Sequence, residues 1–321
     1  MEMQGVGLKV FRQKLATSLE IRGQLQVPAR FSPDRGSRSA ERVEIPIVSR
    51  VALAPGIPRI DIQTEIDNRA EDHRLRVHFP APFTVDAADY DGHFEVVRRP
   101  LGVPEKGAAW VEDPRPEVPQ RAFTDVSNGK LGLMLANRGL PEVEVIAAPA
   151  GAEIALTLLR SVGWLSRDDL PVRPGHAGPG FETPGGQVPG KWVFDYALIP
   201  HAGDWQAAFP QAYAFEAPLR AMTSGLHAGE RPAFGAFVSH TPVEFVISAL
   251  KEAEDGRGWV VRGYNITAEP IEVTIKPWWA FAHAERVNLA EAALAELVPT
   301  EDGSVNLAVG AYEVATVRFV V

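Results

Sequence analysis

The chain has 321 residues, a formal net charge of −9 and no cysteine. This length allows about two domains, and the acidic balance argues against a nucleic-acid-binding protein, because such a protein needs a basic surface. The lack of cysteine excludes disulfide bonds, thiolate nucleophiles and metal sites built on cysteine. Residues 1–10 hold no apolar signal-peptide segment and no run of about 18 apolar residues occurs, so we expect a cytoplasmic protein that does not span a membrane.

Apolar and polar residues alternate in many short segments, which is typical of antiparallel strands with one buried face. The clearest of these segments are residues 60–67, 74–79, 154–158, 271–276 and 317–321. Turn-forming pairs of Asp or Asn with Asn or Gly lie between them, at residues 67–68, 91–92, 128–129, 255–256 and 302–303. The pattern predicts an all-β fold built from sandwiches.

Two segments favour helix by composition. Residues 204–215 could form a short helix that begins near Asp204, and residues 289–297 are rich in Ala, Glu and Leu. We therefore expect little helix, confined to these two places.

Two segments interrupt the strand pattern, residues 31–40 and residues 161–191. The second contains 12 Gly or Pro among its 31 residues. Loops of this length inside a compact domain are uncommon and are often functional. A surface crossover that binds no ligand is the other interpretation of this loop. A further flexible run at residues 220–232 predicts a domain boundary, which divides the chain into residues 1–222 and 223–321.

Several common motifs for catalysis and cofactor binding are missing from the sequence. It contains no phosphate-binding glycine loop, no dinucleotide fingerprint and no G-x-S-x-G nucleophile motif. The eight histidines do not have the spacing of a zinc site, so no metal-binding residue is predicted. Asp89 with Asp91, and Asp168 with Asp169, stand close enough in sequence to suggest a glycosidase carboxylate pair. Because Asp is a common turn residue, we expect a hairpin turn at the first pair and a turn or helix start at the second.

Trp278 and Trp279 could stack on the apolar face of a sugar. On a strand, however, one ring would face the core and the other the outside, so packing inside the protein is the simpler interpretation.

Five strings are more particular than composition explains. They are residues 67–76, 123–129, 137–142, 156–167 and 200–205. In this order and spacing they resemble the C-terminal half of bacterial α-mannosidases of glycoside hydrolase family 38. The resemblance extends from about residue 5 to the end, and residues 248–264 match the final β-domain of that family.

This resemblance implies a large β-supersandwich followed by a smaller β-sandwich. The enzymes of the family are zinc-dependent, retaining hydrolases of α-mannosides. Their catalytic carboxylates and their His and Asp zinc ligands belong to an N-terminal α/β domain and a helical bundle, which the sequence does not contain. No catalytic residue, metal ligand or cofactor is therefore assigned here, and zinc is expected only in the full-length enzyme.

The family also places an arginine near bound sugar, on a loop that the large β-domain extends toward the catalytic domain. Arg173 is the best match and Arg167 the second, because a guanidinium offers several donors to hydroxyl or carboxylate oxygens. Asp168 and Asp169 could accept from sugar hydroxyls or orient that arginine.

Two hypotheses follow. In the first, the chain is the non-catalytic part of an α-mannosidase, which packs on the catalytic domain of the same protein and lends a loop to the site for the α-mannoside. An exposed apolar surface near residues 161–191 would agree with this role. In the second, the chain is a free-standing carbohydrate-binding or scaffold module. Self-association is left open by both.

Overall fold

The computed structural model describes residues 3–226, 228–229 and 232–321. The chain forms two compact units, one made of the residues up to Asp91 with Arg98–Pro218, and one made of Gly92–Val97 with Leu219–Val321. The predicted boundary between residues 222 and 223 lies four residues beyond the end of the first unit, and residues 227, 230 and 231 of the predicted boundary segment lie outside the described residues.

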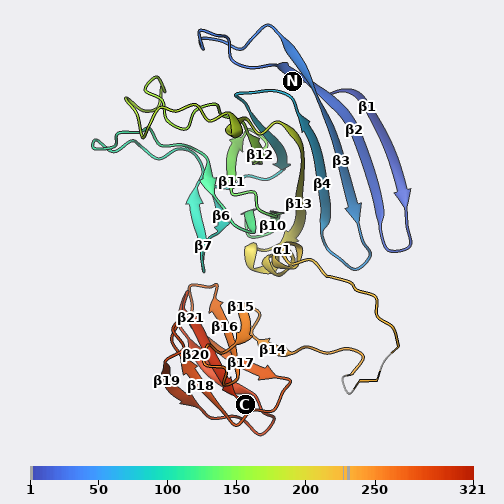
Figure 1. The fold of residues 1–321 in the computed structure, drawn as a ribbon, viewed down its shortest axis with the longest axis vertical. Coiled ribbons are helices and arrows are strands. Elements are labelled where there is room, and N and C mark those ends of the chain that lie inside the picture. The colour runs from blue at the N-terminus through green and yellow to red at the C-terminus, as the bar shows by residue number, and fades with distance from the viewer. Residues whose placement is uncertain (1–2, 227, 230–231) are drawn as a thin grey trace. The chain divides into compact units, whose positions relative to one another are not determined.

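The first unit is built on a sheet of nine strands and a sheet of four (Figure 1). The order in the larger sheet is β1 (Met3–Arg12), β2 (Thr17–Pro28), β3 (Arg42–Leu53), β4 (Ile60–Asn68), β13 (Gly190–Ala202), β10 (Leu131–Asn137), β9 (Phe123–Ser127), β6 (Ala87–Asp91) and β7 (Val96–Pro100). The order in the smaller sheet is β5 (Arg74–Ala81), β12 (Gly151–Arg160), β11 (Glu142–Ala148) and β8 (Val118–Pro119).

The core of this unit is supplied by the apolar positions of the alternating segments. In β4, Ile62 and Ile66 are buried while Gln63 between them is exposed. Ile154 and Leu156 of β12 join the same core cluster from the smaller sheet. The period-two pattern therefore has the physical cause that the sequence predicted, a sheet with one face turned to the core.

The apolar face of the larger sheet becomes increasingly exposed from β4 toward β1. Val10, Leu19, Val51 and Ile62 lie in one row across β1, β2, β3 and β4, so their side chains share a face. Ile62 is 8% exposed but Val10 is 59% exposed. Figure 1 shows β1–β3 extending beyond the strands of the smaller sheet. The apolar side of this end of the sheet therefore lies open.

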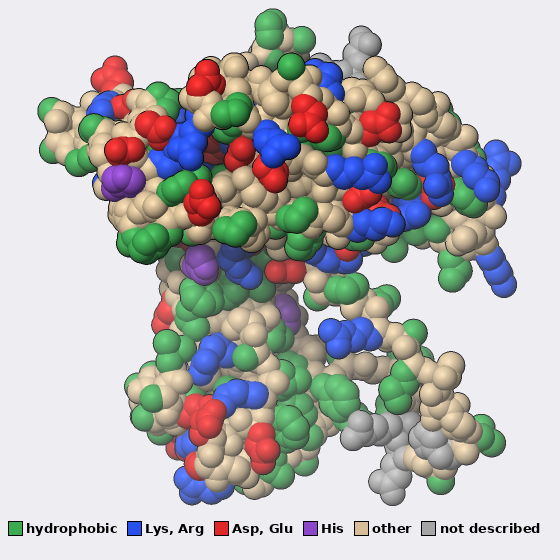
Figure 2. All heavy atoms as spheres, turned by 45° about the horizontal axis from the view of Figure 1, so that its top comes forward, with side chains coloured by type: hydrophobic (Ala, Val, Ile, Leu, Met, Phe, Trp, Pro, Cys, Tyr) green, Lys and Arg blue, Asp and Glu red, His purple; other side chains and the backbone are tan. Residues whose placement is uncertain are grey.

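The opposite face of β1–β3 is charged. Lys9, Glu20 and Arg50 form the neighbouring row, and Glu20 accepts hydrogen bonds from Arg50 at 3.0 Å and from Arg22 at 2.6 Å. Figure 2 shows Lys and Arg side chains gathered over this end of the first unit. This face has the composition of a solvated surface.

Helix is scarce, as predicted. A 3₁₀ turn, Trp205–Ala207, is followed by α1 (Phe209–Glu216), and the Asp204 side chain caps the turn by accepting from the Gln206 amide at 3.0 Å. The predicted helical segment at residues 204–215 is confirmed. α1 packs against β10 and β13.

The helix predicted at residues 289–297 is wrong. Its last five residues form β19 (Ala293–Leu297), which pairs with β18 (His283–Val287). Asn288 accepts hydrogen bonds from the amides of Ala290 and Ala292 and so forms a turn before the strand. The neighbouring strand β18 supplies backbone partners to residues 293–297, and this pairing outweighs a helix propensity of a few tenths of a kcal/mol per residue.

The second unit is a smaller sandwich. One sheet has the order β14 (Val238–Thr241), β17 (Ile271–Pro277) and β20 (Val305–Val309). The other has the order β15 (Phe245–Glu252), β16 (Trp259–Asn265), β21 (Val314–Val320), β18 and β19. Phe245, Ile275 and Phe319 lie in its buried core. The all-β fold class with a large and a smaller sandwich is confirmed. No helix of the described residues is long and apolar enough to cross a membrane.

Candidate functional site

The long loop at residues 161–191 leaves β12 and returns in β13, and backbone pairing holds its two ends together. The Val162 amide donates to the Gly186 carbonyl at 2.9 Å, and the Thr183 amide donates to the Gly163 carbonyl at 2.7 Å. Trp164 forms a β-bridge with Glu182. The loop is therefore ordered, and its two ends lie side by side. We call these paired ends, residues 162–164 and 182–188, the base of the loop.

Asn68, at the end of β4, ties this base to the sheet. Its buried amide donates to the carbonyls of Gln187 and Val188 at 3.2 and 3.0 Å, and its Oδ1 accepts from the Ala70 amide. Gln187 in turn bonds Asp72 at two points, accepting from its amide and donating to its carboxylate. Asn68 belongs to the first string that carries the family resemblance, and its role is to anchor the loop.

A cavity of about 660 Å³ lies beside the base of the loop. Its walls contain apolar side chains, including Phe31, Trp164 and Leu165, and four arginines facing four carboxylates. The charged residues are Arg74, Arg115, Arg160, Arg167, Asp72, Glu112, Glu117 and Glu142. A cavity of this size, with apolar walls and several hydrogen-bonding groups, suits a polar small molecule such as a sugar.

The charged groups at the floor are already paired. Arg74 binds Glu117, and its guanidinium also lies 3.3 Å from Glu142. Burial alone would raise the pKa of Glu117, but the hydrogen bond from Arg74 and the nearby charge of Arg115 outweigh it and hold that pKa below its ordinary value. Arg160 is the looser group, because its side chain is 66% exposed and reaches Glu142 only at 4.0 Å.

Of the four predicted sugar-binding residues, only Arg167 lines this cavity. Its guanidinium binds the carboxylate of Asp169, and this hydrogen bond raises the pKa of Arg167 and lowers that of Asp169. Asp168 lies 3.8 Å from His176. The structure thus brings Arg167 and Asp169 together, within the loop itself.

Arg173 lies farther along the loop and pairs with Glu112 at 3.3 Å. The Asp113 amide donates to the Val172 carbonyl at 2.8 Å, so the segment between β7 and β8 runs beside the loop (Figure 1). The Nε of Arg173 is buried and has no hydrogen-bond partner among the described residues. Arg173 therefore joins two loops, and its role toward sugar stays a prediction.

The aromatic part of the site was not predicted as such. Trp164 carries the guanidinium of Arg35 5.1 Å above its ring, in an adjoining hollow of about 320 Å³. Phe31 carries Arg38 in the same way at 5.0 Å. Arg35 and Phe31 come from the segment at residues 31–40, which the sequence marked only as a loop. Their meeting with Trp164 depends on long-range folding that no local pattern indicates.

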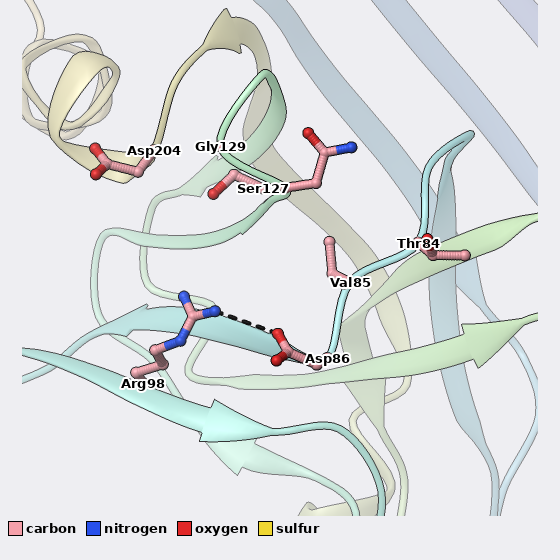
Figure 3. Close-up of a pocket in the computed structure, with 8 residues that line it drawn as sticks. Thr84, Val85, Asp86, Arg98, Ser127, Gly129 and Asp204 are labelled. Atoms are coloured by element: carbon pink, nitrogen blue, oxygen red, sulfur yellow. Dashed lines mark hydrogen bonds and ion pairs between the residues drawn. The ribbon is translucent and has the colours of Figure 1, made fainter.

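A second hollow, of about 660 Å³, opens elsewhere on the first unit (Figure 3). Arg98 points across it and lies 3.3 Å from Asp86. The other nitrogen of the Arg98 guanidinium donates to Asp89 at 2.9 Å. Asp89 stands directly opposite Asp125 on the neighbouring strand, and both carboxylates are buried.

Burial is the main cause of the pKa shifts of these two carboxylates. Burial raises the pKa of Asp89 to about 6, with Arg98 opposing the shift and the charges of Asp125 and Asp204 adding to it. Burial also raises the pKa of Asp125, against the hydrogen bond from His201, whose Nε2 lies 2.7 Å away. That carboxylate raises the pKa of His201 although burial alone would lower it.

The hairpin turn expected at Asp89 and Asp91 is wrong, because both residues lie inside β6 and are 4% and 1% exposed. Asp91 accepts from the hydroxyl of Tyr213 at 2.8 Å and from the amide of Ala122 at 2.9 Å. Their alternation with Ala88 and Tyr90 was a strand signal, which the turn preference of aspartate obscured.

The residues that the structure describes do not fit a resident metal. No group of three or more His, Asp or Glu side chains among the described residues could hold a metal ion. Asp89, Asp125 and His201 lie near one another, but Asp89 accepts a hydrogen bond from Arg98, and Asp125 is hydrogen-bonded to His201.

Two domain families match the chain. Residues 12–171 match the glycosyl hydrolases family 38 C-terminal domain, and residues 244–317 match the glycosyl hydrolases family 38 C-terminal beta sandwich domain. The first match ends within the long loop, at residue 171, and the second lies within the smaller sandwich.

The chain spans a third or less of the length of the two curated relatives described next. A Halalkalibacterium halodurans protein, provisionally named mannosylglycerate hydrolase, is 30% identical over 95% of the chain, which covers 33% of that protein. Human alpha-mannosidase 2C1 is 28% identical over 67% of the chain, which covers 18% of it. A solved alpha-mannosidase from Enterococcus faecalis V583 superposes with a TM-score of 0.79 at 26% identity, over 98% of this chain and 35% of that one.

Proposed function

Because the chain belongs to glycosyl hydrolase family 38 and contains its C-terminal domains, we propose that it is the non-catalytic portion of a zinc-dependent, retaining α-mannosidase of the cytoplasm. The single observation that carries the proposal is the match of nearly the whole chain to about one third of each of two larger relatives. In this proposal the chain packs on a catalytic portion and lends a loop to the sugar site.

The open apolar end of the larger sheet supports the packing role. Leu8, Val10 and Leu53 are 67%, 59% and 54% exposed on a face that is buried elsewhere in the same sheet. The long loop adds Leu165 and Phe181, 77% and 72% exposed, which agrees with the apolar surface expected near residues 161–191. Exposed apolar side chains at each of these two places agree with a role as interfaces.

The cavity beside the loop supports the sugar-binding role. Arg160 and Arg115 have side chains that are 66% and 54% exposed, so their donors can turn to a ligand without leaving a buried carboxylate unpaired. Trp164 supplies an aromatic wall. Arg167 is proposed to act through its ordered pair with Asp169, which fixes the edge of the cavity.

The chemistry itself is proposed to lie outside this chain. Zinc would be held by residues of the catalytic portion, since the described residues offer no group of metal ligands. The substrate class is an α-mannoside, and the name of the Halalkalibacterium halodurans relative makes an α-mannoside with a carboxylate-bearing aglycone a compound to include in assays. The two exposed arginines of the cavity could receive such a carboxylate.

The decisive experiment compares the chain alone with the chain co-expressed with a family 38 catalytic portion from the same genome. We expect no zinc-dependent hydrolysis of an aryl α-mannoside by the chain alone, and hydrolysis by a complex that co-purifies with it. Turnover by the chain alone would overturn the assignment of catalysis to another portion. Failure of every family 38 catalytic portion of that genome to bind the chain would overturn the packing role.

A further inference from the structure

The second unit contains a hollow that the proposed function does not use. It has a volume of about 520 Å³ and lies where β17 ends. Apolar side chains line one part of it and polar side chains another. The apolar group is Pro277, Trp278, Trp279, Phe281 and Pro299, and the polar group is Ser239, Lys276 and Asp302.

Trp278 and Trp279, which follow β17, point in different directions. Trp279 turns inward, where its ring lies 5.8 Å from that of Trp259 and 6.1 Å from that of Phe319. Trp278 is 50% exposed and meets the ring of Phe237 edge to face at 5.9 Å. The Trp278 amide also donates to the Phe237 carbonyl at 2.8 Å. Trp278 is therefore a large aromatic surface whose position is fixed before any ligand arrives.

The polar part of the hollow is equally well fixed. Lys276 donates to Asp302 at 3.0 Å. Asp302 also accepts from the hydroxyls of Thr300 and Ser304, at 2.6 and 2.8 Å, and these bonds hold its pKa well below the ordinary range. The Asp302 carboxylate therefore stays ionised at neutral pH and acts as a fixed acceptor.

We propose that this hollow binds a neutral hexopyranose unit of a carbohydrate chain, with the C–H face of the sugar on Trp278 and its hydroxyls on Lys276 and Asp302. A flat aromatic surface beside a fixed donor and a fixed acceptor matches a ligand that has one apolar face and a rim of hydroxyls. The charges of Lys276 and Asp302 cancel, so the site offers no net attraction to an anion or a cation. This binding would be additional to the sugar site of the first unit and does not depend on it.

The test follows the indole N–H signals of the 321-residue chain by NMR while a mannobiose is added. The chain has seven tryptophans, and the signal that Trp278→Ala removes identifies that ring. We expect mannobiose to shift the Trp278 signal with a dissociation constant of about 1–10 mM. Lys276→Met, which keeps the length of the side chain but not its donors, should weaken binding at least fivefold. Trp110→Ala is the matched control, because Trp110 is 49% exposed and belongs to the first unit.

The outcomes of this test concern the hollow of the second unit. The proposal is supported if mannobiose shifts none of the six remaining indole signals in Trp278→Ala while the rest of the spectrum is unchanged, and if Trp110→Ala still binds. The proposal is overturned if no neutral hexoside shifts the Trp278 signal at about 50 mM, or if only an anionic sugar does. Mannobiose-induced shifts of other indole signals that persist in Trp278→Ala would overturn the proposal and would favour the sugar site proposed for the first unit.

Discussion

Asp89 is a buried side chain that makes the stability of the fold depend on pH. Its carboxylate is 4% exposed and faces Asp125 across the strand pair, with Arg98 as its cationic partner. Burial raises the pKa of Asp89 from 3.8 to about 6, and the charges of Asp125 and Asp204 add to this against Arg98. A carboxyl whose pKa is higher in the folded state than in the unfolded state binds its proton more tightly when folded. Its contribution to stability is therefore lost as the pH rises from about 4 through 6.

Asp89→Asn should remove this dependence. Between pH 5 and pH 7.5 we expect the wild-type chain to lose about 1–2 kcal/mol more unfolding free energy than the variant. Urea denaturation of both proteins at the two pH values measures the difference. Asp86→Asn is the control, because Asp86 meets the same arginine but its side chain is 92% exposed. Equal pH dependence in wild type and Asp89→Asn would contradict the shifted pKa.

The elements divide into those that sequence can predict and those that depend on tertiary contacts. Strands such as β4 and β17 can be predicted from the alternation of apolar and polar residues, because each strand turns one face to the core and the other away from it. The helical propensity at residues 289–297 misleads, because β18 offers a strand partner that no local pattern indicates. In the long loop, glycine and proline content marks an unusual connection. That Asn68, 93 residues before Ser161, anchors its base could be learned only from the structure.

Asn68→Ala should therefore loosen the loop. The variant leaves the carbonyls of Gln187 and Val188 without their buried donor, at a cost of about 1–3 kcal/mol. We expect trypsin to cut after Arg167 at least tenfold faster, while most of the sheet stays protected in hydrogen exchange. Asn306→Ala, at an exposed position in β20, should not change the cleavage rate. Unchanged cleavage in Asn68→Ala would show that the backbone pairs at the base suffice.

At the scale of the whole molecule, composition and alternation predicted the sandwiches but gave no sign that one sheet is wider than its partner. In the sequence, the residues of the row from Val10 to Ile62 look like ordinary buried positions of a strand. The exposed fraction of the side chain nevertheless rises from 8% at Ile62 to 59% at Val10. Which apolar residues meet a second layer is decided by the number of strands in that layer. The open end of the sheet is the surface on which the proposed packing can be tested.

Replacing Leu8 and Val10 together by Gln should separate folding from association. Both side chains are more than half exposed, so the unfolding free energy of the chain should change by about 0.5 kcal/mol or less. If a catalytic portion covers them, the loss of apolar burial costs about 2–4 kcal/mol, which is a thirtyfold or greater loss of affinity. Urea denaturation measures the first quantity, and co-purification followed by titration calorimetry measures the second.

Lys9→Gln is the matched control, because Lys9 lies between these two residues on the same strand but belongs to the opposite, charged row. It should leave both the stability of the chain and its affinity for the catalytic portion unchanged. Equal weakening by Lys9→Gln and by the double variant would assign the contact to the edge of β1 and not to its apolar face. Full affinity in the double variant would show that the open end of the sheet serves another purpose, and light scattering of the two variants would then test whether it pairs with a second copy of the chain.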